Sequence, residues 1–167
     1  MKLILAEFNG VFGLKGRISF LSSLPLILHA PNIAGKTNVI TGIRLCFLGH
    51  RIFREILREE VLLNPLSEGH VTCYFSQWNR TYKLTYIFKR SGGKVRRSCK
   101  LASTSEISVD PGLTADQLAQ LFEAQEWKDE AKTPNDIKTC LEQIQIYPEV
   151  TDILLAPSNV EGYIRAM

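Results

Sequence analysis

Residues 24–49, LPLILHAPNIAGKTNVITGIRLCFLG, decide how the rest of the sequence is interpreted. The segment 24–30 is almost continuously apolar, which is typical of a strand buried on both faces. From residue 36 onward, apolar side chains occupy much of the circumference of a predicted helix. The stretch therefore predicts a buried strand, a turn containing Gly-Lys-Thr, and a helix in direct succession.

The turn follows most of the phosphate-loop pattern G-x-x-x-x-G-K-[ST]. Residues 30–37 read APNIAGKT, so the end of the pattern is matched and its first glycine is replaced by Ala30. Ile33 stands where many such loops have another glycine, and a positive φ there would cost about 1–3 kcal/mol. The alternative interpretation is a plain helix start, with Lys36 and Thr37 in its first turn.

If the loop works, its chemistry assigns a role to each part of the turn. Backbone N–H groups hold the phosphates of ATP, Lys36 neutralises the β and γ oxygens, and Thr37 ligates Mg²⁺. No acidic pair follows the late predicted strand 151–156, so no catalytic residue is assigned. The candidate nucleotide-binding residues are Asn32, Ile33, Ala34, Gly35, Lys36, Thr37 and Asn38.

Composition limits the remaining possibilities. A chain of 167 residues with 45% hydrophobic content is expected to form one core and one domain. The net charge of +3 permits contact with nucleic acid without requiring it. The 4 cysteines are widely spaced, which predicts reduced thiols and a cytoplasmic location. No long apolar segment or cleavable leader is evident, so neither membrane insertion nor secretion is expected.

The rest of the chain predicts strands and helices in a definite order. Two short strands, 2–8 and 17–21, precede the segment above, and a polar helix, 51–60, follows it. The segments 70–78, 82–90 and 94–102 are separated by NR and SGG turns, which indicates an antiparallel meander. Two helices are predicted next. The first covers 114–127, with Thr114 or Asp116 near its start, and the second covers 133–145, where Thr133 followed by Pro134 is a favoured helix opening.

Taken together, these residues resemble the N-terminal half of an SMC-superfamily ATPase head. Pro31, Asn32, Gly35 and Lys36, followed by Thr-Asn, match the P-N-x-x-G-K-[ST]-N form of the phosphate loop in that group. The resemblance is to the DNA double-strand-break-repair and chromosome-organising ATPases, with the archaeal coalescins as a close branch. The resemblance implies an α/β fold (an α+β mixed sheet), that is, a P-loop ABC-type ATPase half-head with an antiparallel β-meander and helices.

The resemblance also implies partners and a location. Residues 1–167 would be the N-terminal lobe of the head, with the coiled coil and the C-terminal lobe absent. The expected partners are the C-terminal half of the head, a second head bound through ATP, and DNA. Such a protein would be associated with the chromosome and would be an ATPase only when both halves of the head are combined.

Departures from the family pattern keep other functions open. Ala30 and Ile33 replace loop glycines, Pro157 stands where a glutamine is usual, and Gly10 stands where the family usually has Arg or Lys. One alternative is therefore a catalytically degenerate head that binds nucleotide or DNA with little hydrolysis. Another is a small P-loop phosphotransferase, although the meander disfavours it.

A basic run, FKRSGGKVRRSCK, crosses the second turn of the predicted meander. Such a patch is able to neutralise several phosphates of a DNA backbone. An equally simple explanation is a charged strand edge that prevents unwanted sheet pairing. The candidate DNA-binding residues are Lys94, Arg96, Arg97 and Lys100.

Overall fold

The computed structural model describes residues 1–21, 36–48 and 68–147. The predicted strand 24–30, helix 51–60 and strand 151–156 lie outside these residues. In chain order the elements are β1 (Lys2–Asn9), the short 3₁₀ helix η1 (Val11–Gly13), β2 (Lys15–Ser19), α1 (Lys36–Leu48), β3 (Glu68–Gln77), β4 (Arg80–Ser91), β5 (Lys94–Ser105), α4 (Ala115–Glu123), β6 (Lys128–Ala131) and α5 (Pro134–Gln143).

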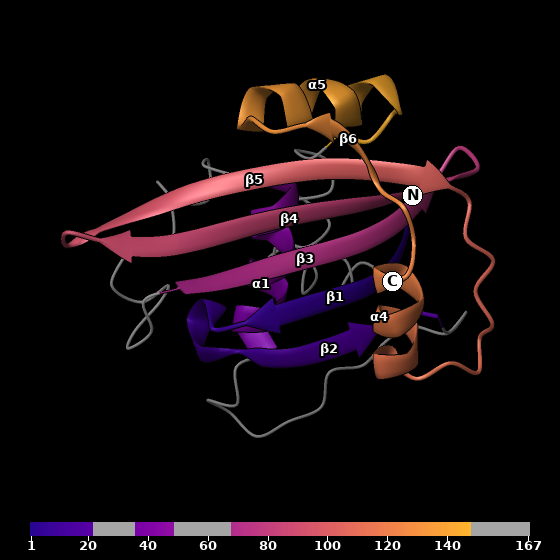
Figure 1. Cartoon of the computed structure of the whole chain (residues 1–167), viewed down its shortest axis with the longest axis horizontal. Coiled ribbons are helices and arrows are strands. Elements are labelled where there is room, and N and C mark those ends of the chain that lie inside the picture. Colours follow the sequence, from indigo (N-terminus) through magenta and orange to yellow (C-terminus); the bar gives the residue numbers. More distant parts are fainter. Residues whose placement is uncertain (22–35, 49–67, 148–167) are drawn as a thin grey trace, which may run out of the picture.

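The strands form one six-stranded sheet in the order β2-β1-β3-β4-β5-β6, and each neighbouring pair is antiparallel (Figure 1). Two-residue turns join the long central strands. Trp78 and Asn79 both have positive φ between β3 and β4, and so do Gly92 and Gly93 between β4 and β5. Such turns match the twist of antiparallel strands, which confirms the predicted meander.

The expected fold class is wrong. An α/β P-loop ATPase half-head with a mixed sheet requires parallel strands joined by helical crossovers, whereas all strand pairs of the described sheet are antiparallel. The expectation rested on the predicted strand 24–30 feeding the next helix. Among the described residues, short turns dictate the pairing of the central strands instead, because a two-residue loop can only join antiparallel neighbours.

One face of the sheet packs against both α1 and α5. Alternate residues of the strands point to this side, including Val71, Cys73 and Phe75 of β3. These side chains are buried in one apolar cluster with Leu45 of α1 and Leu141 of α5. We call this the helix-packed face.

The opposite face carries only α4 among the described helices. Leu5 of β1 and Tyr74 of β3 are buried there against Leu118 and Phe122 of α4. In Figure 1, α4 lies near one end of the sheet, away from the far end of the β4–β5 hairpin. We call this side of the sheet the open face, because most of it has no helix over it in the described part of the chain.

Local capping signals locate the starts of α4 and α5. Thr114 caps α4 in a capping box with Gln117, and Thr133 caps α5 with Pro134 directly behind it. Both predicted starts are confirmed. Helix α4 ends at Glu123, earlier than the predicted end at residue 127. Trp127 lies beyond this end, and its indole donates to the carbonyl oxygen of Phe122 at 2.9 Å.

The cysteines agree with the expectation of reduced core thiols. All four are free, and Cys46, Cys73 and Cys99 are buried. Burial raises the pKa of the Cys46 thiol well above its ordinary value, because a thiolate would lose its hydration there. These thiols therefore act as small apolar core groups.

Candidate functional site

The candidate nucleotide-binding residues are only partly described. Asn32, Ile33, Ala34 and Gly35 lie outside the described residues, as do Ala30 and Pro157. Lys36, Thr37 and Asn38 are the first described residues of α1, which agrees with the helix predicted from residue 36 onward.

The first turn of α1 is suited to an anion. It contains no acidic residue, and the free N–H groups at a helix start carry a partial positive charge. The Thr37 side chain is exposed, while Asn38 is half-buried. The Asn38 amide donates to the carbonyl oxygen of Phe12 at 3.4 Å, which joins the helix start to η1.

The η1 turn explains why Gly10 replaces the basic residue expected from the resemblance. Gly10 has φ 82°, and its N–H donates to the carbonyl oxygen of Leu14 at 2.7 Å. Glycine adopts this left-handed conformation without the strain that arginine or lysine would incur. Phe12 is also left-handed, with φ 55°, and its side chain is buried in the core. The turn therefore has a fixed shape beside the start of α1.

The second candidate site is the β4–β5 hairpin, whose tip extends past β3. The last described pair of β3 with β4 is Glu68 with Lys89, so within the described part of the chain the residues beyond it form a two-stranded ribbon. Figure 1 shows this ribbon projecting from the sheet. Cationic residues in and next to the ribbon are Lys89, Arg90, Lys94, Arg96, Arg97 and Lys100, all of them exposed.

The hairpin cations do not all lie on one side. Cys99 and Leu101 of β5 are buried on the helix-packed face. Arg97 lies two residues before Cys99 on the same strand, so it is on this face too. Arg97 also lines a cavity of about 120 Å³ together with Thr133 and Pro134 at the start of α5. Lys94, Arg96 and Lys100 occupy the alternate positions and lie on the open face. The structure thus brings together three of the four predicted DNA-binding residues and separates Arg97 from them.

Carboxylates compensate some of these cations. Lys89 Nζ lies 3.5 Å from Glu68, and Lys100 Nζ lies 2.6 Å from Asp129, which also accepts from Lys132 at 3.2 Å. Hydrogen bonds from Lys100 and then Lys132 lower the pKa of Asp129. Arg90, Lys94 and Arg96 have no ion-pair partner among the described residues. The tip therefore carries the uncompensated charge.

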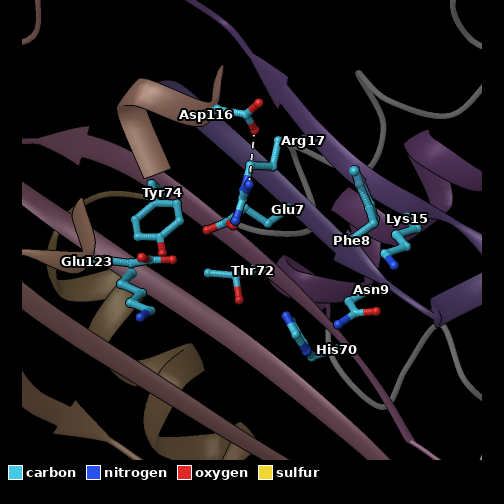
Figure 2. Close-up of a pocket in the computed structure, with 12 residues that line it drawn as sticks. Glu7, Phe8, Asn9, Lys15, Arg17, His70, Thr72, Tyr74, Asp116 and Glu123 are labelled. Carbon is cyan, nitrogen blue, oxygen red and sulfur yellow. Dashed lines mark hydrogen bonds and ion pairs between the residues drawn. The ribbon is translucent and has the colours of Figure 1, made fainter. Parts of the chain in front are cut away.

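The open face also contains a cleft of about 420 Å³ that sequence reasoning missed (Figure 2). On one side of it, Arg17 of β2 bridges Glu7 of β1 at 2.8 Å and Asp116 of α4 at 3.0 Å. These hydrogen bonds, first the one that Arg17 donates to Glu7 and then the one to Asp116, raise the pKa of Arg17. A signal existed, because Glu7 and Arg17 are cross-strand partners, but it required the register of β1 and β2.

Lys83 lies along another wall of the cleft. Its ammonium group lies 5.7 Å from the ring centre of Tyr74 and 6.0 Å from that of Trp127, within the range of cation–π attraction. Burial, and secondly the negative charge of Glu7, raise the pKa of the Tyr74 phenol. At the opposite end of the cleft lie Asn9, Lys15 and His70 (Figure 2).

No protein-family model matches the sequence, and no curated protein matches it. Within residues 1–21, 36–48 and 68–147, no group of His, Cys, Asp and Glu side chains is arranged to hold a metal ion. None of the helices described has the length and apolar character needed to cross a membrane.

Proposed function

We propose that this chain binds duplex DNA through the β4–β5 hairpin and ATP at the start of α1, as part of a chromosome-organising or DNA-repair protein related to the SMC superfamily. The single observation that supports it best is the projecting cationic ribbon. The proposal needs no parallel P-loop sheet, since it rests on the charges and donor groups of the two sites.

The ribbon offers what a phosphate backbone requires. Lys89 pairs with Arg96 across the two strands, so two basic side chains lie beside one another there, and Lys94 lies two residues from Arg96 toward the tip. Each phosphate neutralised by lysine or arginine releases counterions, which drives sequence-independent binding. Phosphate contacts of this kind fix the position of a protein on DNA without reading its sequence.

The ATP part of the proposal rests on the start of α1. The backbone N–H groups at this start, together with Lys36 and Thr37 of the motif, are of the types that bind a triphosphate with Mg²⁺: donors, a cation and a hydroxyl. The hydrogen bond from Asn38 to Phe12 keeps η1 beside this turn. In this proposal Lys36 contacts the phosphates and Thr37 ligates Mg²⁺.

The same proposal includes two protein partners and a location. A C-terminal segment of the head and a second copy of the protein would come together around ATP and control how DNA is held on the chromosome. If so, adding ATP and Mg²⁺ to the chain with its C-terminal segment raises the mass measured by light scattering to that of a dimer. A mass that stays unchanged at saturating ATP would contradict this part.

The DNA part is tested by reversing two charges of the hairpin. Arg96→Glu combined with Arg97→Glu should weaken binding to a labelled duplex of any sequence, measured by fluorescence anisotropy at several salt concentrations. For every phosphate that the variant no longer neutralises, the slope of log K against log salt should fall by about 0.9. Affinity and slope equal to those of the parent protein would leave the hairpin as a protective charged edge.

A matched control carries the same charge change elsewhere. Lys2→Glu combined with Lys128→Glu reverses two exposed charges at the other end of the sheet, where Lys2 pairs with Ser76 and Lys128 with Ser103. This variant should keep most of the affinity, because these lysines are remote from the ribbon. Equal losses in both double variants would indicate an effect of net charge alone.

The ATP part is tested by Lys36→Ala in the chain combined with its C-terminal segment. Alanine is a good helix former, so α1 should persist while nucleotide affinity falls. Titration calorimetry with ATP and Mg²⁺ measures the affinity, and circular dichroism checks the fold. Equal ATP binding by the variant and the parent would show that the turn is not a phosphate site.

A further inference from the structure

We propose that DNA contacts only the open face of the β4–β5 hairpin, through Lys94, Arg96 and Lys100, and that Arg97 takes no part in binding it. This inference rests on the proposed DNA-binding function and specifies which surface of the hairpin is used. The sequence alone treats Arg96 and Arg97 as equivalent members of one basic run.

Strand alternation separates the two arginines. Successive side chains of a strand point to opposite faces. Val95, Cys99 and Leu101 belong to the cluster on the helix-packed face, so Arg97, which lies between Val95 and Cys99 at the same alternation, projects to that side. Arg96 projects to the other side.

The helix-packed face is obstructed beside Arg97. Arg97 lines the small cavity with Tyr86, Cys99 and the first residues of α5. Figure 1 shows α5 lying along β5 and β6, so a duplex approaching from this side meets the helix. Burial raises the pKa of Tyr86 and of Cys99, and the nearby positive charge of Arg97 opposes part of this rise. Arg97 therefore belongs to the surroundings of α5.

The open face is accessible at the same position along the hairpin. The helix on that side, α4, contacts β1 and β2 and lies far from the ribbon in Figure 1. Lys94 and Arg96 alternate on this face about 6.8 Å apart, and Lys89 stands opposite Arg96 on β4. Ser98 adds a hydroxyl group between Arg96 and Lys100, and Thr85 lies opposite Lys100 on β4. These are the side-chain types that most often contact phosphate oxygens.

The open face continues as a polar row across the sheet. Register places Ser98, Ile87, His70 and Asn9 side by side on β5, β4, β3 and β1, and Lys15 follows on β2. Asn9, Lys15 and His70 line one end of the cleft in Figure 2. Apart from Ile87, the residues of this row offer hydrogen-bond donors for phosphate. DNA bound at Arg96 could therefore make further polar contacts across the sheet toward β2.

Carboxylates form ion pairs with two of the lysines on this face. Glu68 and Asp129 hold Lys89 and Lys100 at 3.5 and 2.6 Å, so these two lysines must leave an ion pair to reach a phosphate. Lys94 and Arg96, which have no such partner among the described residues, are available without this cost. Arg96 is therefore expected to contribute more than Lys100.

The test compares adjacent residues with the same charge change. Arg96→Glu should weaken duplex DNA binding by about tenfold or more and lower the salt slope by about 0.9 or more. Arg97→Glu should change the affinity by less than about twofold and leave the slope unchanged. Anisotropy titrations at several salt concentrations measure both, and circular dichroism melts verify that each variant is folded. Arg96→Gln and Arg97→Gln repeat the comparison without reversing the charge.

The outcomes separate this inference from the proposed function. Equal losses in the Arg96 and Arg97 variants, or a loss in Arg97→Glu alone, would overturn the choice of face while leaving DNA binding by the hairpin intact. If neither substitution changes affinity or slope, DNA binding by the hairpin fails, and this inference fails with it. If Arg97→Glu does not fold, Arg97→Gln supplies the comparison.

Discussion

The ring of Tyr74 stacks on the ring of Phe122, with centroids 4.6 Å apart and planes inclined by 18°. Tyr74 belongs to β3 and Phe122 to α4, so this contact joins the helix to the open face of the sheet. Trp127 completes the group at 5.9 Å from Tyr74, and its indole donates to the Phe122 carbonyl oxygen. The three rings determine where α4 lies and hence how much of the open face stays uncovered.

We predict that Phe122→Ala lowers the free energy of unfolding by about 3–5 kcal/mol, because it removes a fully buried ring and leaves a cavity. Urea denaturation followed by circular dichroism measures the loss. Gln120→Ala, an exposed position on the same helix, is the control and should change stability by no more than about 0.5 kcal/mol. Similar values for both variants would show that the ring does not hold α4.

A second prediction concerns Gly42 in the middle of α1. A Cβ atom there would lie 2.6 Å from Cε1 of Phe8, whose ring is buried in the core. Gly42→Ala should therefore destabilise the fold by about 1–3 kcal/mol through overpacking, although alanine favours a helix by about 1 kcal/mol over glycine.

A compensating substitution tests this explanation. Combining Gly42→Ala with Phe8→Leu should recover part of the loss, because the smaller side chain vacates the space that the new methyl group needs. Thermal melts of both single variants and the double variant supply the comparison. If the two losses simply add, the close approach of Phe8 to Gly42 is not what requires glycine.

The third prediction concerns alkaline pH. Burial, followed by the charge of Glu7, raises the pKa of Tyr74, and burial, followed by the charge of Cys99, raises that of Tyr86. Because the folded-state pKa values exceed the unfolded value of about 10, stability is fully present below pH 10. It is lost as the pH rises further, by about 1.4 kcal/mol per pH unit for each phenol.

Variants identify the responsible groups. Tyr74→Phe and Tyr86→Phe should each make the free energy of unfolding fall less steeply between about pH 10 and 11.5, because each removes one phenol that loses its proton on unfolding. Urea denaturation at fixed pH values measures these slopes. Gln120→Ala, which replaces an exposed side chain that does not titrate, is the control and should leave the slope unchanged. A slope unaffected by all three substitutions would assign the alkaline loss to other groups.

Local signals in the sequence predicted the meander and the starts of α4 and α5 correctly. The NR and SGG turns, and the capping residues Thr114 and Thr133, act on their immediate neighbours and can therefore be recognised without the rest of the chain.

Long-range relationships were not predictable from those signals. The pairing of β1 with β3 joins residues far apart in sequence, and it decides that the sheet is antiparallel throughout its described part. The Glu7–Arg17–Asp116 bridge likewise needs the strand register and the position of α4. For the basic run, composition indicated a charged surface, while its division between Arg96 and Arg97 required knowing which side of β5 is buried.

The fourth prediction concerns Trp78, an exposed residue with φ 51° in the turn between β3 and β4. A side chain other than glycine is strained in this conformation. The indole N–H of Trp78 donates to the carbonyl oxygen of Ile144 at 2.8 Å, and the Gln77 amide donates to the same oxygen at 3.0 Å. The turn is thus bonded to the chain that follows α5. The hydrogen bond from the Trp78 indole stabilises the fold and offsets the strain of the positive φ.

Two substitutions separate the bond from the strain. Trp78→Phe keeps the strained backbone and an aromatic ring but loses the bond, so the free energy of unfolding should fall by about 1 kcal/mol. Trp78→Gly loses the bond and also removes the strain, so its loss should be smaller. Urea denaturation followed by circular dichroism measures both, and the fluorescence of Trp127 gives an independent signal, since the chain has 2 tryptophans. If Trp78→Phe is as stable as the parent, the indole bond contributes nothing. If Trp78→Gly is the less stable of the two, the positive φ is not a strain that glycine relieves.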